Sequence, residues 1–153
     1  MPMLEKIYAP NTWAARLLDP LQSLFALGAR LYVSWQFLKS GYLKVTSWDS
    51  TIYLFENEYH TPLLSPHAAA VAGSFGELFF PTLLVLGFAS RLGAIGLFAV
   101  NAMAVVSYAQ VLLAEGSEAA LGQHILWGTL LLFLMLYGPG KFSLDYVLHR
   151  SRF

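Results

Sequence analysis

Four long apolar stretches cover most of this chain, and polar side chains interrupt three of them near their centres. The stretches span about residues 21–40, 67–89, 91–114 and 119–138. A helix of about 20 residues, rising 1.5 Å per residue, crosses the ~30 Å hydrocarbon layer of a bilayer. The apolar runs are continuous rather than alternating, which favours helices over a membrane β-barrel. We therefore predict an all-α integral membrane four-helix bundle that forms one domain over residues 1–153.

The composition supports a lipid environment for most of the chain. Hydrophobic residues make up 57% and charged residues 12%, whereas soluble domains average about 45–50% and 25%. The longest interval between apolar stretches, residues 41–67, is too short for an independent soluble core. The net charge is zero and basic residues are scattered, which argues against nucleic-acid binding. The chain has no cysteine, which excludes disulfides and thiolate metal sites.

The distribution of basic residues predicts the orientation in the membrane. The first apolar stretch carries Arg30 and lacks a small-residue cleavage site, so we interpret it as a retained span and not as a signal peptide. With four spans, both termini lie on one side of the bilayer. That side carries six basic residues against Lys39 and Lys44 on the other: Lys6, Arg16, Arg91, Lys141, Arg150 and Arg152. The positive-inside rule then predicts a multi-pass protein of a bacterial inner membrane with both termini in the cytoplasm.

The segment 48–59, between the first two spans, is predicted to be a short amphipathic helix at the membrane surface. Trp48, Ile52, Phe55 and Tyr59 recur at helical spacing on one face. Such a helix can be a lid over the bundle or only a connector. At the other end of the bundle, Ser143 is predicted to cap a short helix over Leu144–His149.

Three polar side chains fall at similar predicted depth inside the spans. Counted from the cytoplasmic ends, Arg30, Glu77 and Asn101 all lie about 13–17 Å into the bilayer. A charge at such a depth is costly unless it is paired. We therefore expect an Arg30–Glu77 ion pair, with Asn101 completing its hydrogen bonds, as a buried polar core. This core either fixes the helix register alone or forms a site for protons or a polar ligand.

Three further polar residues are candidate contacts for a quinone or another ligand. His124 is the only histidine in the interior of a predicted span, since His67 lies at the very start of the second one. Its imidazole can be structural, or it can bind a quinone, ligate haem or relay protons. Gln36 and Lys39 lie with aromatic residues toward the predicted outer surface, where they either form an interfacial belt or receive a quinone headgroup.

No residue pattern predicts a metal site. His60 and His67 lie near Glu56 and Glu58 in the outer interval, but their spacing matches no established ligand motif. Nucleotide-binding and hydrolase motifs such as the P-loop are also absent from the sequence.

Several segments together resemble the DoxX family of small bacterial membrane proteins. They are Arg30 in the first span, Lys39–Lys44 after it, Gly76-Glu77, Leu86–Arg91 and Tyr137–Asp145, which reads YGPGKFSLD. The resemblance covers about Leu21 to Asp145. It implies a four-helix inner-membrane bundle whose relatives include membrane subunits of thiosulfate:quinone oxidoreductase and proteins of oxidative-stress or metal-responsive systems.

Two functional hypotheses follow from the residues and the resemblance together. In the first, the chain is a membrane subunit or partner of a quinone-linked redox or stress system, and quinone is its cofactor. In the second, it is a non-enzymatic membrane scaffold or assembly partner that binds another protein through the segment 48–59. The expected partners are the lipid bilayer and either another protein or a second copy of this chain. A transporter is less well supported, because the sequence shows neither duplicated halves nor broken helices.

Overall fold

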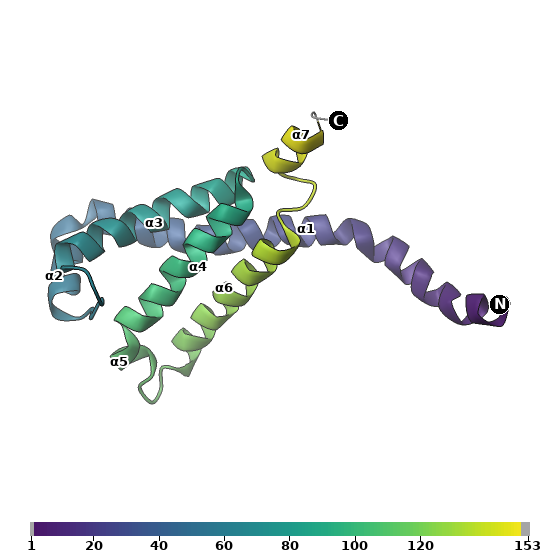
Figure 1. The fold of residues 1–153 in the computed structure, drawn as a ribbon. Coiled ribbons are helices and arrows are strands. Elements are labelled where there is room, and N and C mark those ends of the chain that lie inside the picture. Colours follow the sequence, from purple (N-terminus) through teal and green to yellow (C-terminus); the bar gives the residue numbers. More distant parts are fainter. Residues whose placement is uncertain (1, 151–153) are drawn as a thin grey trace.

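A computed structural model describes the backbone of residues 2–150 and the side chains of residues 13, 14 and 17–148. The basic side chains Lys6, Arg16, Arg150 and Arg152, used above for the orientation, lie outside the described side chains. Every regular element in the described part is a helix (Figure 1). The helices are α1 (Pro2–Thr46), α2 (Trp48–Asn57), α3 (Pro66–Leu86), α4 (Ser90–Ser107), α5 (Ala109–Leu112), α6 (Glu118–Tyr137) and α7 (Leu144–Arg150).

Four long helices form the bundle, and the predicted all-α membrane fold is confirmed. The helix α1 packs along α3, α3 along α4, and α4 along α6. Among the described residues, α3, α4 and α6 are long and apolar enough to cross a membrane. The helix α1 is not among these three, and polar residues such as Arg30 and Gln36 interrupt its apolar stretch. Its N-terminal part extends well beyond the other helices (Figure 1).

Three predicted boundaries differ from the structure by more than a turn, and one of them is the end of α1, which lies at Thr46 and not near residue 40. The helix α1 begins at Pro2, long before the predicted start near residue 21, and it continues through Pro10 and Pro20. The third predicted span, 91–114, ends instead at Ser107. There the carbonyl of Ser107 accepts a hydrogen bond from the backbone N–H of His60, and Tyr108 leaves the helical conformation before the short α5.

The helix α2 packs through the predicted apolar face. Phe55 is buried against Ala69 and Ala70 of α3, and this small cluster also includes Trp48, Ile52 and Tyr59. The hydroxyl of Thr51 donates to the carbonyl of Lys44, which joins the start of α2 to the end of α1. The apolar face of α2 is therefore covered by the chain itself.

A tight turn makes α3 and α4 antiparallel neighbours. Gly87 ends α3 in the left-handed conformation, with φ 68° and ψ 30°. The N–H of Phe88 donates to the carbonyl of Leu83, which closes the helix end. At the opposite end of α3, Ser65 is the N-cap and Pro66 the first residue, next to the predicted start of the second span at residue 67.

Candidate functional site

The predicted Arg30–Glu77 ion pair is not formed. The guanidinium of Arg30 instead donates to backbone carbonyls of Leu84 (2.7 Å) and Val85 (3.0 Å) at the end of α3, and to two carbonyls beyond α6. These are the carbonyls of Pro139 (3.1 Å) and Phe142 (2.7 Å). Arg30 is only 1% exposed, so the expectation that it is buried is confirmed while its expected partner is wrong.

The helix register explains why the two ions do not meet. Gly41 of α1 lies directly against α3, where an added Cβ would come within 3.0 Å of the Glu77 Cβ. Arg30 precedes Gly41 by eleven residues, or about 16 Å along a helix. Arg30 is therefore level with the C-terminal end of α3, whereas Glu77 is level with the C-terminal part of α1.

The YGPGKFSLD segment after α6 has a structural role, because Arg30 binds the carbonyls of Pro139 and Phe142 within it. Asp145 accepts hydrogen bonds from the N–H groups of Ala89 and Ser90, both at 2.8 Å, and so caps the N-terminus of α4. Its own N–H donates to the carbonyl of Gly87. The Ser143 hydroxyl accepts from the N–H of Tyr146, which confirms it as the cap of α7. This end of the bundle is held by polar contacts to the main chain.

Glu77 is paired with Lys44, the last lysine of α1. The Lys44 ammonium lies 2.8 Å from Oε1 and 2.7 Å from Oε2 of Glu77, and it also donates to the Ser40 hydroxyl at 2.8 Å. The two side chains are 16% and 9% exposed. Lys44 thus reaches inward from a position that the sequence analysis placed in the outer loop.

Asn101 is paired with His124 and not with the two ions. The Asn101 Nδ2 donates to the backbone carbonyl of His124 at 3.0 Å, and its Oδ1 lies 2.9 Å from the His124 Nδ1. The His124 ring also packs edge-on against Trp127, with 4.9 Å between ring centroids. The expected single polar core is therefore three separate polar groups.

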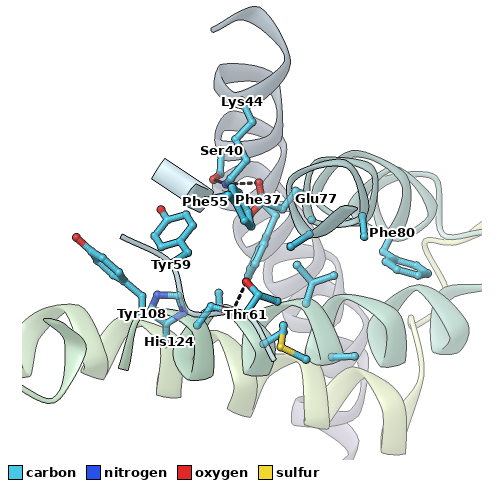
Figure 2. Close-up of a pocket in the computed structure, with 18 of the residues that line it drawn as sticks. Phe37, Ser40, Lys44, Phe55, Tyr59, Thr61, Glu77, Phe80, Tyr108 and His124 are labelled. Carbon is cyan, nitrogen blue, oxygen red and sulfur yellow. Dashed lines mark hydrogen bonds and ion pairs between the residues drawn. The ribbon is translucent and has the colours of Figure 1, made fainter. Parts of the chain in front are cut away.

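A cavity of about 480 Å³ brings two of these groups together. It lies between the C-terminal part of α1, the middle of α3, the second half of α4 and the first half of α6, with α2 and α5 at its edge (Figure 2). Its polar lining comes from a small set of side chains: Gln36, Ser40, Lys44, Tyr59, Thr61, Glu77, Ser107, Tyr108 and His124. The remaining lining is apolar and consists of four aromatic residues, Phe37, Phe55, Phe80 and Trp127, together with small and aliphatic residues.

The cavity contains some, but not all, of the predicted ligand contacts. Gln36 and His124 both line it, whereas Lys39 does not and is exposed. Lys39 lies five residues before Lys44, which turns it about 140° away around the helix. Arg30 is also outside the lining, so the predicted residues do not form one site.

Tyr59 was expected on the apolar face of the surface segment but not as part of a site. Its ring packs edge-on against Phe55 and Tyr108, with centroid distances of 4.8 and 5.1 Å. Burial raises the pKa of the Tyr59 hydroxyl, and the charges of neighbouring groups that include Glu77 raise it further. The hydroxyl therefore keeps its proton at neutral pH and can donate a hydrogen bond.

Sequence analysis missed Lys44 and Trp127 as members of the site. A signal for Lys44 was present, since Arg30, Phe37 and Lys44 recur every seven residues and so share one face of α1. Trp127 follows His124 by three residues and lies on the same helix face. Its position in an apolar run gave no sign that it lines a cavity.

The comparison with known families fits this bundle. The DoxX family model matches residues 25–110, more than half of the chain. The chain belongs to the DoxX family. The DoxX match covers Arg30, Lys44, Glu77 and Asn101, and it ends before His124 and the YGPGKFSLD segment. No curated protein and no solved structure matches the chain.

Proposed function

We propose that this DoxX protein binds a lipid-soluble quinone in the cavity and is the membrane subunit or partner of a quinone-linked redox system. The proposal places it in a bacterial inner membrane with both termini in the cytoplasm. The observation that carries it is the cavity of about 480 Å³, an apolar and aromatic space with a few polar groups on its walls. Pockets for small ligands typically measure about 300–1,000 Å³ and have this mixed lining.

The charges on the cavity wall favour an uncharged ligand. Lys44 and Glu77 are the charged residues of the described lining, and they neutralise each other at 2.7 Å. An anion such as a small oxoacid would have to displace Glu77 from Lys44, and the exposed carboxylate would then repel it. A neutral headgroup needs no such exchange and can use the hydroxyl and amide groups.

The aromatic walls favour a flat ring. Phe37 packs edge-on against Trp127 at 5.4 Å between centroids, and Phe55, Phe80 and Tyr108 come from three other elements. Aromatic side chains bind rings through offset-stacked or edge-to-face contacts. A quinone combines such a ring with two carbonyl oxygens and an apolar tail that can remain in lipid.

The scaffold alternative has less support. Its expected docking surface was the apolar face of the segment 48–59, and Phe55 of that face is buried against Ala69 and Ala70 of the same chain. A partner would have to detach α2 from α3 to reach it.

Filling the cavity tests the proposal. A Cβ at Gly73 would lie 3.6 Å from the Phe55 ring, an ordinary contact, so Gly73→Leu should fold and place its side chain in the cavity. We expect it to weaken binding of a short-chain benzoquinone at least tenfold, measured by equilibrium dialysis of the purified protein in detergent. Gly28→Leu is the matched control, because a Cβ there meets nothing within 4 Å and Gly28 lies outside the cavity lining.

The two variants separate specific binding from partition into detergent. Equal affinity of the wild-type protein and Gly73→Leu, or no saturable binding by the wild-type protein, contradicts quinone binding in this cavity. Organic extraction of the gently purified protein gives an independent reading, since the wild-type protein should retain quinone that Gly73→Leu has lost.

A further inference from the structure

The hydrogen bonds of Asn101 fix the proton position on the His124 ring. A backbone carbonyl only accepts, so the Asn101 atom facing the His124 carbonyl at 3.0 Å must be the NH₂ group. The amide oxygen therefore faces the ring, and it requires a proton on Nδ1, 2.9 Å away. In a neutral imidazole the other nitrogen, Nε2, is then an acceptor. No described residue donates to it.

A second unused polar group lies beside this acceptor. The indole Nε1 of Trp127 is buried and has no hydrogen-bond partner among the described residues. An indole N–H can only donate, and an unpaired buried donor is uncommon in folded proteins. Trp127 lines the cavity next to His124, with 4.9 Å between the two ring centroids. The cavity wall therefore offers one unused acceptor, the His124 Nε2, while the unpaired indole N–H of Trp127 is buried behind the wall.

We infer that this wall recognises a phenolic hydroxyl, and that the cavity therefore prefers the reduced quinol over the oxidised quinone. A phenolic hydroxyl in the cavity can donate its proton to the His124 Nε2. A quinone carbonyl only accepts, so it leaves the His124 Nε2 without a donor. The inference rests on the proposed function and adds which redox form binds and which residue distinguishes it.

The paired state of Lys44 supports the same assignment. The ammonium donates to Glu77 and Ser40, so it has little remaining capacity for a carbonyl oxygen. Lysine would otherwise be the strongest donor for a quinone on this surface. The unpartnered His124 Nε2 is therefore the group that distinguishes the ligand forms.

Anaerobic binding measurements on the full-length protein in detergent test this preference. The probes are a decyl-benzoquinol, its oxidised quinone, its dimethyl ether and 1-decanol. We expect the wild-type protein to bind the quinol about tenfold more tightly than the quinone, the effect of one additional hydrogen bond. The dimethyl ether has no proton to donate, and 1-decanol has no ring, so both should bind more weakly than the quinol.

One substitution assigns the contact. His124→Phe should weaken quinol binding about tenfold and so remove the preference for quinol, because the ring is retained and only the acceptor is lost. Trp35→Phe is the control and should keep the preference, because Trp35 is 65% exposed and outside the cavity. Thermal unfolding of each variant reports whether it is folded.

The outcomes separate this inference from the proposed function. Equal affinity of the wild-type protein for quinol and quinone, or a preference that persists in His124→Phe, overturns the inference. Quinone binding that Gly73→Leu weakens would leave the proposed function standing in that case. Binding of 1-decanol as tight as that of the quinol overturns the recognition of a phenolic group, and failure of both redox forms to bind overturns both proposals.

Discussion

The Lys44–Glu77 pair is the most consequential single contact near the cavity. Both side chains are largely buried, at 16% and 9% exposure, and the carboxylate receives both of its close contacts from one ammonium. A buried ion pair need not stabilise a protein relative to apolar residues. Removal of one partner is costly, however, because the other charge is left without compensation.

Single and double substitutions should show this asymmetry. We expect Lys44→Met and Glu77→Gln each to lower the free energy of unfolding, the former by about 3–5 kcal/mol because it leaves Glu77 charged. The double variant should be more stable than Lys44→Met alone. Thermal unfolding in detergent, followed by circular dichroism, is the measurement.

Lys39→Met is the control for the loss of a lysine from α1, because Lys39 is exposed. Its unfolding temperature should match that of the wild-type protein. A Lys44→Met protein as stable as Lys39→Met would show that the Lys44–Glu77 pair does not contribute to the free energy of unfolding.

Residue types alone predicted which polar groups are buried but not how they pair. Measured over the whole residue, Arg30, Glu77 and Asn101 are 1%, 7% and 5% exposed, as their place in apolar runs indicated. The predicted partners were wrong. The prediction placed Arg30, Glu77 and Asn101 at equal depth by counting from the ends of the apolar stretches, and these ends do not give the register of the helices. The true register depends on the close approach of Gly41 to α3, a packing contact that periodicity does not encode.

At the scale of elements, the turn between α3 and α4 is the most constrained connection in the fold. Gly87 has φ 68°, and a Cβ there would lie 2.6 Å from the Arg30 Nη2 and 2.8 Å from the Ser143 Cα. The absence of a side chain at this position therefore allows α1, α3 and the segment after α6 to meet. Gly116 also has a positive φ, of 87°, but a Cβ there meets nothing within 4 Å.

The two glycines give a matched pair of substitutions. Gly116→Ala should cost about 1–2 kcal/mol, the strain of a left-handed conformation in an alanine. Gly87→Ala should cost about 1–3 kcal/mol more, because the methyl group also collides with backbone and with Arg30. The difference between their free energies of unfolding in detergent measures the packing of this turn. Equal losses would show that the neighbours move aside freely.

Most helix positions could be predicted because apolar length and cap residues are local signals. Ser65-Pro66, Gly87 and Gly138 end or begin helices close to the predicted residues. The early end of α4 at Ser107 could not be predicted in this way. It depends on hydrogen bonds from the loop before α3, where His60 and Thr61 contact Ser107 from 46 or more residues away.

At the scale of the whole molecule, the bundle has two chemically different ends. One end holds the Arg30 contacts, Asp145 and the exposed side chains of Arg91 and Lys141. The other holds α2, α5 and the loop that contains Leu63. The proposed orientation places the first end in the cytoplasm, since basic residues are retained on that side.

The absence of cysteine makes this orientation directly measurable. Leu63 is fully exposed, at 101%, so Leu63→Cys should react with a membrane-impermeant maleimide when intact spheroplasts are treated. Lys141→Cys should react only after lysis, because it lies at the opposite end. The reverse pattern of labelling would place both termini outside the cytoplasm.

The acceptors around Arg30 have a consequence for how this protein tolerates change. All four are main-chain oxygens, contributed by Leu84, Val85, Pro139 and Phe142. A main-chain oxygen persists whichever amino acid occupies its position, so these four sites can vary in side chain without removing a partner. The guanidinium has no such substitute. A substitution at any of these four positions therefore keeps the hydrogen-bond acceptor, whereas a substitution of Arg30 removes the donor of all four hydrogen bonds.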